Sequence, residues 1–287
     1  MKTTTRLRHL INQPGMVIAP GAYDGITARL IEQAGFPVVY MTGAGTSMSR
    51  GFPDFGLLSM SEMVDNAAMM ARTVEIPLIS DADTGYGNEL NVTRTVREFE
   101  SRGIAGIHIE DQVSPKRCGH LDGKEIIARG EYISKIKAAV AARRDADFVI
   151  IARTDSRAVA GFDEAMARAN AAIAAGADMA FVEAVQTEEE LAQVPHRVKG
   201  PCLLNVVPGG KTPPVSMQDA QRLGYRLAIL PGLLLSATMV ACDQALHSLK
   251  ETGISASGPK GSSVIDTFRR FGADEWNDLR QRFASKE

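Results

Sequence analysis

Short runs of apolar, β-branched residues alternate along this chain with longer segments of helical periodicity. The apolar runs are nearly continuous in hydrophobicity, as strands buried on both faces should be. They are Met16–Pro20, Pro37–Met41, Ile76–Ser80, Ile104–Ile109, Phe148–Ala152, Met179–Val182, Cys202–Leu204 and Leu227–Leu230. The helical segments between them are Gly25–Ala34, Ser61–Thr73, Val92–Arg102, Gly130–Arg144, Phe162–Ala175, Glu188–Val194 and Ser216–Leu223. Several of these end at a glycine that is typical of a helix C-cap, namely Gly35, Gly103, Gly176 and Gly224.

Repeated strand–helix units over about 250 residues are typical of a (β/α)₈ or TIM barrel, an α/β fold. A doubly wound open sheet is the alternative. We expect a catalytic barrel domain over residues 1–253 and a linker with a C-terminal helix over residues 254–287. In the second part, Ile254–Ser263 has the composition of a flexible connection. Val264–Phe283 has the pattern of a helix whose aromatic face packs onto the barrel or onto a neighbouring subunit.

The composition excludes several classes of protein. The 287 residues include 32 Lys+Arg and 34 Asp+Glu, a net charge of −2, which argues against nucleic acid as the main partner. No apolar run approaches the roughly 18 residues of a membrane span, and the N-terminal stretch lacks the apolar core of a signal peptide. Three cysteines cannot form a disulfide framework, and Cys202 and Cys242 fall in element patterns typical of packing residues. We therefore expect a cytoplasmic protein.

Polar residues gather where the predicted strands end, which in a barrel is the face that carries chemistry. The acids at this face are Asp81, Asp83, Glu110, Asp111 and Asp155. Uncompensated carboxylates repel one another, and a divalent cation with hard oxygen ligands, Mg²⁺ or Mn²⁺, removes the conflict. The alternative is that these acids cap helices or pair with Arg153, but a single arginine cannot neutralise them all.

Two glycine-rich pieces fail the nucleotide-binding patterns. Gly43-Ala44-Gly45 lacks the last glycine of GxGxxG, and the first glycine that a P-loop ending at Gly210-Lys211-Thr212 requires is Asn205. The stretch Gly43–Gly45 is better suited to offering backbone N–H groups to a small anion.

The most distinctive local feature is Ser114–His120, in a long segment without helix or strand pattern after the fourth strand. Long ordered barrel loops usually carry function. Cys118 has Lys116, Arg117 and His120 nearby, and positive neighbours are expected to lower the pKa of a thiol and make it a proton donor or nucleophile. The alternative is a surface thiol with incidental basic neighbours.

Taken together, these residues resemble the isocitrate lyase/phosphoenolpyruvate mutase superfamily. The resemblance extends from PGAYDGITARL through DADTGYG, GIHIEDQ, KRCGH, ARTD and NVVPGGKTP to SVIDTF. The KRCGH loop after HIEDQ is similar to the catalytic loop of its carbon–carbon lyases, and the chain length favours the short 2-methylisocitrate and 2,3-dimethylmalate lyases. The resemblance implies Mg²⁺-dependent retro-aldol cleavage of a 2-hydroxy acid, with an α-keto acid such as pyruvate retained on the metal.

The resemblance also implies roles for individual residues. Asp81 and Asp83 match metal-binding acids, and Asp54 and Glu110 match acids that hold metal-bound water. Cys118 matches the general acid that protonates the departing enolate, with His120 and Glu183 around it. Tyr40 matches a tyrosine that helps to remove the hydroxyl proton, and Arg153 matches the arginine that binds the keto-acid unit. The residues expected to bind substrate are Thr42, Gly43, Ala44, Lys116, Arg117, Gly119 and Asn205.

Two departures from the pattern bear on the substrate. Thr42 and Ala44 replace serine and glycine in the cradle of the keto-acid carboxylate. After Asn205, Val207 and Pro208 supply no side-chain donor, so the leaving half is expected to be smaller or less charged than that of a tricarboxylate.

Three other functions compete with a lyase. They are hydrolysis or decarboxylation of oxaloacetate, a phosphoenolpyruvate mutase-type reaction (carboxyphosphonoenolpyruvate phosphonomutase-like), and non-catalytic binding of a keto acid. The cysteine loop argues against decarboxylation and against the mutase, and the complete set of acids argues against non-catalytic binding. The resemblance further implies a homotetramer, a dimer of dimers, in which the C-terminal helix is exchanged between subunits.

Overall fold

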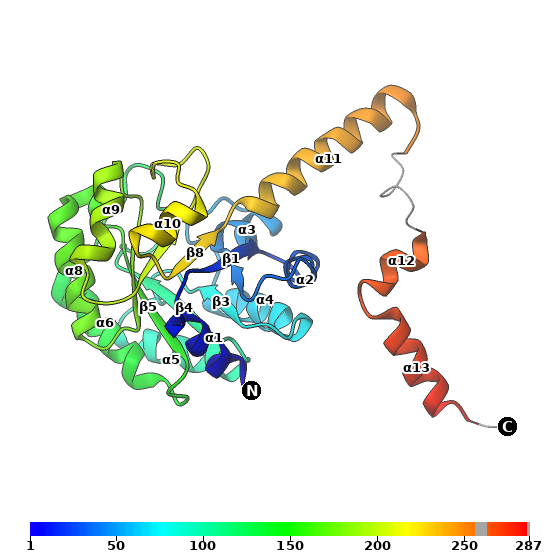
Figure 1. Ribbon diagram of the computed structural model, residues 1–287, viewed down its shortest axis with the longest axis horizontal. Coiled ribbons are helices and arrows are strands. Elements are labelled where there is room, and N and C mark those ends of the chain that lie inside the picture. Colours follow the sequence, from blue (N-terminus) through cyan, green and yellow to red (C-terminus); the bar gives the residue numbers. More distant parts are fainter. Residues whose placement is uncertain (256–262, 286–287) are drawn as a thin grey trace. The chain divides into compact units, whose positions relative to one another are not determined.

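The structure is a computed structural model that describes residues 1–255 and 263–285. Parallel strands form one closed barrel in sequence order, with helices around it (Figure 1). The strands are β1 (Val17–Ala22), β2 (Val39–Met41), β3 (Leu78–Asp81), β4 (Gly106–Glu110), β5 (Val149–Thr154), β6 (Met179–Val182), β7 (Cys202–Asn205) and β8 (Leu227–Leu230). The predicted TIM barrel is therefore confirmed, and the open-sheet alternative is wrong because β1 pairs with β8.

The helices follow the strands along the chain. They are α1 (Thr3–Asn12), α2 (Gly25–Gln33), α3 (Gly43–Ser49), α4 (Met60–Thr73), α5 (Glu89–Ser101), α6 (Arg129–Ala142), α7 (Ser156–Ala160), α8 (Phe162–Ala174), α9 (Glu188–Arg197), α10 (Met217–Leu223), α11 (Leu233–Thr252), α12 (Val264–Arg269) and α13 (Ala273–Phe283). The glycines expected to end helices adopt the positive φ that this role requires, for example 83° at Gly35 and 102° at Gly224.

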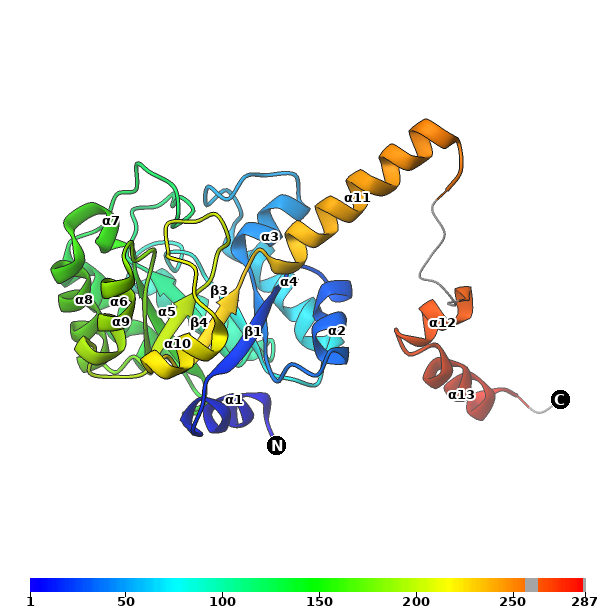
Figure 2. The ribbon, with the colours of Figure 1, turned by 45° about the horizontal axis from the view of Figure 1, so that its top comes forward.

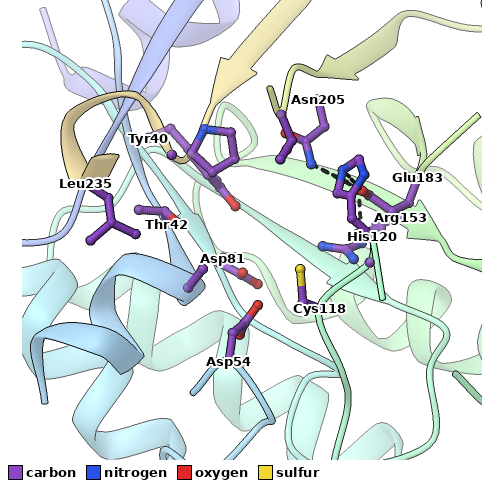
Figure 3. A pocket seen from close by; sticks show the side chains of 15 residues that line it. Tyr40, Thr42, Asp54, Asp81, Cys118, His120, Arg153, Glu183, Asn205 and Leu235 are labelled. Carbon is purple, nitrogen blue, oxygen red and sulfur yellow. Dashed lines mark hydrogen bonds and ion pairs between the residues drawn. The ribbon is translucent and has the colours of Figure 1, made fainter. Parts of the chain in front are cut away.

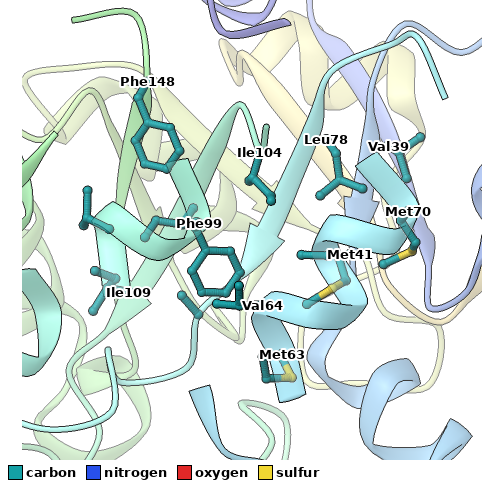
Figure 4. Packing of buried hydrophobic residues seen from close by; sticks show 14 of the residues in the cluster. Val39, Met41, Met63, Val64, Met70, Leu78, Phe99, Ile104, Ile109 and Phe148 are labelled. Carbon is teal, nitrogen blue, oxygen red and sulfur yellow. The ribbon is translucent and has the colours of Figure 1, made fainter. Parts of the chain in front are cut away.

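The apolar core has two layers. Inside the barrel, Ile79, Ile151 and Phe181 from the strands pack together with Leu7 of α1. Figure 2 shows α1 covering the end of the barrel opposite the strand C-termini. Outside the barrel, side chains from β2 to β4 pack against α4 and α5, as Phe99 and Met63 do in Figure 4. Because α1 covers the end of the barrel at the strand N-termini, a site can form only at the face where the strands end.

The chain divides by its internal contacts into two compact units, residues 1–236 and 237–287. The predicted functional division at residue 253 stays a prediction. The expected continuous helix Val264–Phe283 is wrong, because the backbone turns at Gly272 with a φ of 88° and separates α12 from α13. Most of the predicted connection Ile254–Ser263 lies outside the described residues. The helices in the described part of the chain include no segment with the length and apolar character of a membrane span.

Candidate active site

A cavity of about 120 Å³ opens at the C-terminal face of the barrel (Figure 3). Most of the predicted site residues line it, namely Tyr40, Thr42, Ala44, Asp54, Asp81, Cys118, Gly119, His120, Arg153, Glu183 and Asn205. Four lining residues form a largely apolar wall, namely Val207, Pro231, Gly232 and Leu235. Strand register brings the polar residues together, because Asp81 pairs with His108 and Glu110 with Arg153 across adjacent strands.

Asp81 and Asp83 lie at the end of β3, beside a lysine from the Cys118 loop. The Lys116 ammonium is 2.5 Å from Asp54 Oδ1 and 3.1 Å from Asp83 Oδ1, and its side chain is buried. Burial, reinforced by the charge of Asp81, raises the pKa of Asp83 to about 6. A single ammonium thus leaves this carboxyl group incompletely stabilised in its ionised form.

Arg153, at the end of β5, is buried among three carboxylates. Its Nη1 is 3.1 Å from Glu110 Oε2, its Nε donates to Asp155 Oδ2 at 2.8 Å, and Nε is 3.8 Å from Glu183 Oε2. The guanidinium also lies over the ring of Phe181, 5.1 Å from its centroid. Its orientation toward the cavity is therefore fixed before any substrate binds.

The acids at the C-terminal ends of the strands are paired with more cations than the sequence suggested. The argument that Arg153 alone faces these acids is wrong, because Lys116, Lys124 and Arg168 also form buried ion pairs with them. Lys124 contacts Asp155, and Arg168 contacts Asp111 at 3.1 Å. Lys116 and Lys124 lie on the loop after β4 and Arg168 lies on α8, so the residues at the strand ends did not by themselves show that these cations face the acids.

The acids Asp81, Asp83 and Glu110 suit a metal ion that takes only some of its ligands from the protein, such as Mg²⁺. Within residues 1–255 and 263–285, no three His, Cys, Asp or Glu side chains form a complete metal site. Mg²⁺, however, commonly takes one or two carboxylates and completes its shell with water and substrate oxygens. Asp81 lines the cavity, and Glu110 Oε1 is buried without a hydrogen bond, whereas Asp83 Oδ1 and Glu110 Oε2 each lie 3.1 Å from a buried cation. Burial raises the pKa of Glu110 well above its usual range, so an added cation would stabilise its charge.

The Cys118 loop closes over the cavity from the segment between β4 and α6. The Cys118 sulfur lies between Asp54 and Asp81 on one side and His120 and Arg153 on the other (Figure 3). Burial raises the pKa of the Cys118 thiol. The expected lowering of this pKa is therefore wrong. Lys116 is turned toward the acids, and Arg117 lies over the ring of Phe55, 5.7 Å from its centroid.

His120 fixes the far end of this loop to the barrel. Its Nε2 is 2.8 Å from Glu183 Oε1, and its Nδ1 accepts the backbone N–H of Lys211 at 3.0 Å. Asn205 Nδ2 donates to both Glu183 oxygens at 3.2 Å. Despite burial, Arg153 and His120 lower the pKa of Glu183, so this carboxylate is ionised and holds three neighbouring groups in place.

Thr42 and Gly43 begin α3 at the end of β2. The Thr42 hydroxyl caps the helix by accepting the N–H of Gly45. A Cβ at Gly43 would lie 2.3 Å from Asp81 Oδ2, so only glycine allows this close approach. The short helix begins at the predicted keto-acid cradle, where Thr42 and Ala44 line the cavity but the buried Gly43 does not.

Sequence reasoning missed His108, whose ring is fully buried beside Tyr40. The Tyr40 hydroxyl is 2.9 Å from His108 Nε2, and the two rings stack with centroids 5.8 Å apart. Burial lowers the pKa of His108 to about 4, so the imidazole is neutral. The motif HIEDQ contains this residue, and a histidine inside a buried apolar strand, just before Glu110, was a signal that could have found it.

Five predicted site residues do not line the cavity, and neither does Pro208, which was expected to face the leaving half of the substrate. Lys116, Asp83 and Glu110 lie buried behind it and Gly43 behind the cradle, whereas Arg117 is exposed. Pro231 and Leu235 contribute to the lining instead of Pro208. Cys242 is exposed in the single chain, contrary to the expectation of a packing residue, whereas Cys202 is buried.

Known proteins resemble this chain over most of its length. The family model described as phosphoenolpyruvate phosphomutase matches residues 7–250. The chain belongs to this family. It is 44% identical over 280 residues to 2,3-dimethylmalate lyase of Eubacterium barkeri, covering 97% of this chain and 94% of that protein. It is also 44% identical over 247 residues to 2-methylisocitrate lyase of Aeropyrum pernix, covering 86% and 80%.

Solved structures of this family have the same fold. A crystal structure of 2,3-dimethylmalate lyase, a member of the phosphoenolpyruvate mutase/isocitrate lyase superfamily, matches with a TM-score of 0.93 and 40% identity, covering 98% and 95% of the two chains. Oxaloacetate acetylhydrolase in complex with 3,3-difluorooxalacetate matches with a TM-score of 0.95 and 37% identity, covering 99% and 98%. The superfamily indicated by the sequence motifs is confirmed.

Proposed function

We propose that the chain is a Mg²⁺-dependent carbon–carbon lyase. It cleaves a 2-hydroxy di- or tricarboxylic acid, of the 2,3-dimethylmalate or 2-methylisocitrate kind, into an α-keto acid such as pyruvate and a second carboxylic acid. The observation that carries this proposal is one small cavity lined by a protonated thiol, a fixed guanidinium and buried carboxylates. The names of two relatives at 44% identity support the same reaction.

The chain's own groups account for the proton transfers. As the substrate hydroxyl loses its proton, its oxygen becomes the carbonyl of the keto acid and the carbon–carbon bond breaks. The bonding electrons pass to the departing carbon, which takes the proton of Cys118. The hydroxyl proton passes to Tyr40 as its phenol gives its own proton to the neutral imidazole of His108 across their hydrogen bond. After the products leave, His108 loses this proton to solvent and the Cys118 thiolate regains one, which restores the starting state. Arg153 binds the keto-acid half and stabilises its negative charge.

Magnesium completes this site in the proposal. Asp81 would hold the ion directly with Asp83 nearby, and Asp54 and Glu110 would bind its water molecules. When bound, the ion supplies Lewis-acid polarisation of the keto-acid oxygens. A relative's structure, phosphonopyruvate hydrolase with oxalate and Mg²⁺, at 31% identity and a TM-score of 0.89, supports this assignment.

The cavity wall favours a leaving half with little charge. Val207, Pro231 and Leu235 have no side-chain donor, and Nδ2 of Asn205, which also lines the cavity, already donates to both Glu183 oxygens. A third carboxylate placed against these residues would lose its hydration without gaining a partner. A dicarboxylic acid with small alkyl substituents, such as 2,3-dimethylmalate, fits this wall better than a tricarboxylic acid does.

Hydrolysis of oxaloacetate is the second candidate, because oxaloacetate acetylhydrolase has a TM-score of 0.95 to this chain. A carboxyvinyl-carboxyphosphonate phosphorylmutase of Arabidopsis thaliana, 38% identical over 287 residues, represents the mutase alternative. Hydrolysis needs a water molecule oriented for attack on a carbonyl carbon. The side chains of Val207, Pro231 and Leu235 in the apolar wall offer no hydrogen-bond acceptor for orienting such a water, whereas Cys118 supplies the proton that a lyase requires.

The proposal extends to assembly and location. The predicted packing face of the C-terminal region has no buried residue within α12 or α13, and Phe268 and Trp276 are exposed in the single chain. We infer a homotetramer in which this region is exchanged between subunits, and a cytoplasmic location.

A screen for keto-acid release tests the function. The purified protein with Mg²⁺ is incubated with 2-methylisocitrate, isocitrate, 2,3-dimethylmalate, citramalate and oxaloacetate, and pyruvate, glyoxylate and oxalate are measured. Pyruvate release from a methyl-substituted 2-hydroxy acid is expected. Release of oxalate from oxaloacetate, with no keto acid from any hydroxy acid, would replace the lyase with the hydrolase.

A further inference from the structure

Lys124, near the end of the Cys118 loop, is a buried ammonium that the proposed reaction does not use. Its Nζ donates to the backbone carbonyl of Gly119 at 2.5 Å and to Asp155 Oδ1 at 2.8 Å. Its side chain is only 1% exposed, and that of Asp155 is fully buried. A buried charge is costly unless it is paired and hydrogen-bonded, and Lys124 has both kinds of partner.

Asp155 is shared between this lysine and the substrate-binding arginine. Arg153 donates to it from Nε at 2.8 Å and from Nη2 at 3.2 Å. Although burial opposes ionisation, Arg153 and Lys124 together hold the pKa of Asp155 well below its usual range. The carboxylate therefore links the guanidinium to the Cys118 loop through two ion pairs.

The backbone at Gly119 packs closely against charged side chains of the site. A Cβ at this position would come within 2.4 Å of Glu183 Cγ and 2.5 Å of Arg153 Nη2. The loop backbone thus rests directly on the two charged side chains of the site. Lys124 binds the carbonyl of Gly119, the residue that follows Cys118, so it holds the backbone next to the thiol at the cavity.

We propose that Lys124 is a positioning residue that couples Arg153 to the Cys118 loop through Asp155. A keto acid adds a further ion pair to a guanidinium that Asp155 already orients, and through Asp155 this ion pair stabilises the contact of Lys124 with the Gly119 carbonyl. The closed position of the thiol is thereby linked to occupancy of the keto-acid site. This inference rests on the proposed function, in which Cys118 supplies the proton.

Alkylation of Cys118 by iodoacetamide, with and without Mg²⁺ and oxalate, tests the coupling. The background is Cys242→Ser, because Cys242 is exposed whereas Cys202 is buried. In Lys124→Met, we expect alkylation to be at least about tenfold faster, as loss of a charge-assisted hydrogen bond allows the loop to open. Oxalate should protect Cys118 in the parent but not in the variant, kcat should fall by a similar factor, and the dissociation constant of oxalate should change little.

Lys135→Met is the matched control, because Lys135 is also buried but its ammonium lies on α6, outside the loop. It should change neither alkylation nor protection. Lys124→Arg should restore part of the protection, and Lys124→Gln, which keeps one donor, serves if Lys124→Met does not fold. A folded variant at position 124 with unchanged alkylation, protection and kcat would overturn the coupling. Absence of carbon–carbon cleavage in the parent protein would instead overturn the proposed function, since the alkylation result does not depend on turnover.

Discussion

The protonation state of Cys118 illustrates how much a single residue depends on its three-dimensional surroundings. Neighbours in sequence predicted a lowered thiol pKa, but the structure turns Lys116 toward acids from other strands and raises the thiol pKa by burial. This state suits the proposed reaction, because an acid must keep its proton until the carbanion forms. No inspection of the loop sequence alone could determine which way Lys116 points.

The pH dependence of Cys118 alkylation checks this state. Since only the thiolate reacts and its pKa is raised above the ordinary value of about 8.5, the rate should still be increasing at about pH 9. The measurement uses the Cys242→Ser background with iodoacetamide. A rate that levels off near neutral pH would show a lowered pKa and contradict the assignment.

Replacing Cys118 with serine tests its role in proton transfer. A serine hydroxyl is a far weaker acid, so turnover should fall by about a thousandfold while oxalate binding stays nearly unchanged. Steady-state kinetics and calorimetric titration measure the two effects. Cys242→Ser, the same change at an exposed thiol, should be neutral. Near-normal turnover in Cys118→Ser would remove this residue from the mechanism.

At the scale of elements, strands and glycine turns were predictable, whereas short helices at the site were not. The buried strands are apolar runs, so their sequences show them directly. By contrast, α3 consists of Gly43–Ser49 without apolar periodicity and depends on a cap from Thr42. The first helix did leave a signal, since Leu7 and Ile11 are spaced by four residues and both are buried. Residues of the cavity wall such as Leu235 belong to no motif, so only the closed barrel brings them to the site.

The close approach of α3 to Asp81 makes Gly43→Ala informative. The added methyl group would collide with Asp81 Oδ2, so Asp81 must shift and oxalate binding in the presence of Mg²⁺ should weaken by at least about tenfold. Gly130→Ala is the matched control, because a Cβ there meets no atom within 4 Å. Equal binding by the two variants, measured by calorimetry, would mean that this contact does not fix the carboxylate.

For the whole molecule, a net charge of −2 conceals a concentrated set of buried ion pairs at one end of the barrel. The sequence identified the acids, but it did not reveal that Lys116, Lys124 and Arg168 reach them from other segments. Strand order brings the acids together, whereas the cations arrive through a loop and a helix whose paths depend on the complete fold.

Removal of the metal tests the remaining part of the acid cluster. Thorough treatment with EDTA should abolish turnover, and added Mg²⁺ should restore it, because the proposed site needs the cation to polarise the keto acid. Binding of oxalate should also require Mg²⁺. Full activity after chelation, with the metal content checked by elemental analysis, would contradict the metal assignment.

The exposed aromatic residues of the C-terminal region give a prediction about assembly. If they pack on neighbouring subunits, the particle mass should be four times the 30.8 kDa of one chain. Light scattering should then show smaller particles for Phe268→Ser combined with Trp276→Ser, because both side chains are exposed in the single chain. A monomeric parent protein would contradict the proposed tetramer.

Cleavage of 2,3-dimethylmalate in D₂O tests the central claim most directly. Nuclear magnetic resonance should detect equal amounts of pyruvate and propionate, with one deuterium at C2 of each propionate molecule, since an exchangeable Cys118 proton is delivered to the departing carbon. The same experiment with Cys118→Ser should yield almost no product. Absence of pyruvate from this and the other hydroxy acids, together with formation of oxalate and acetate from oxaloacetate, would contradict the lyase assignment.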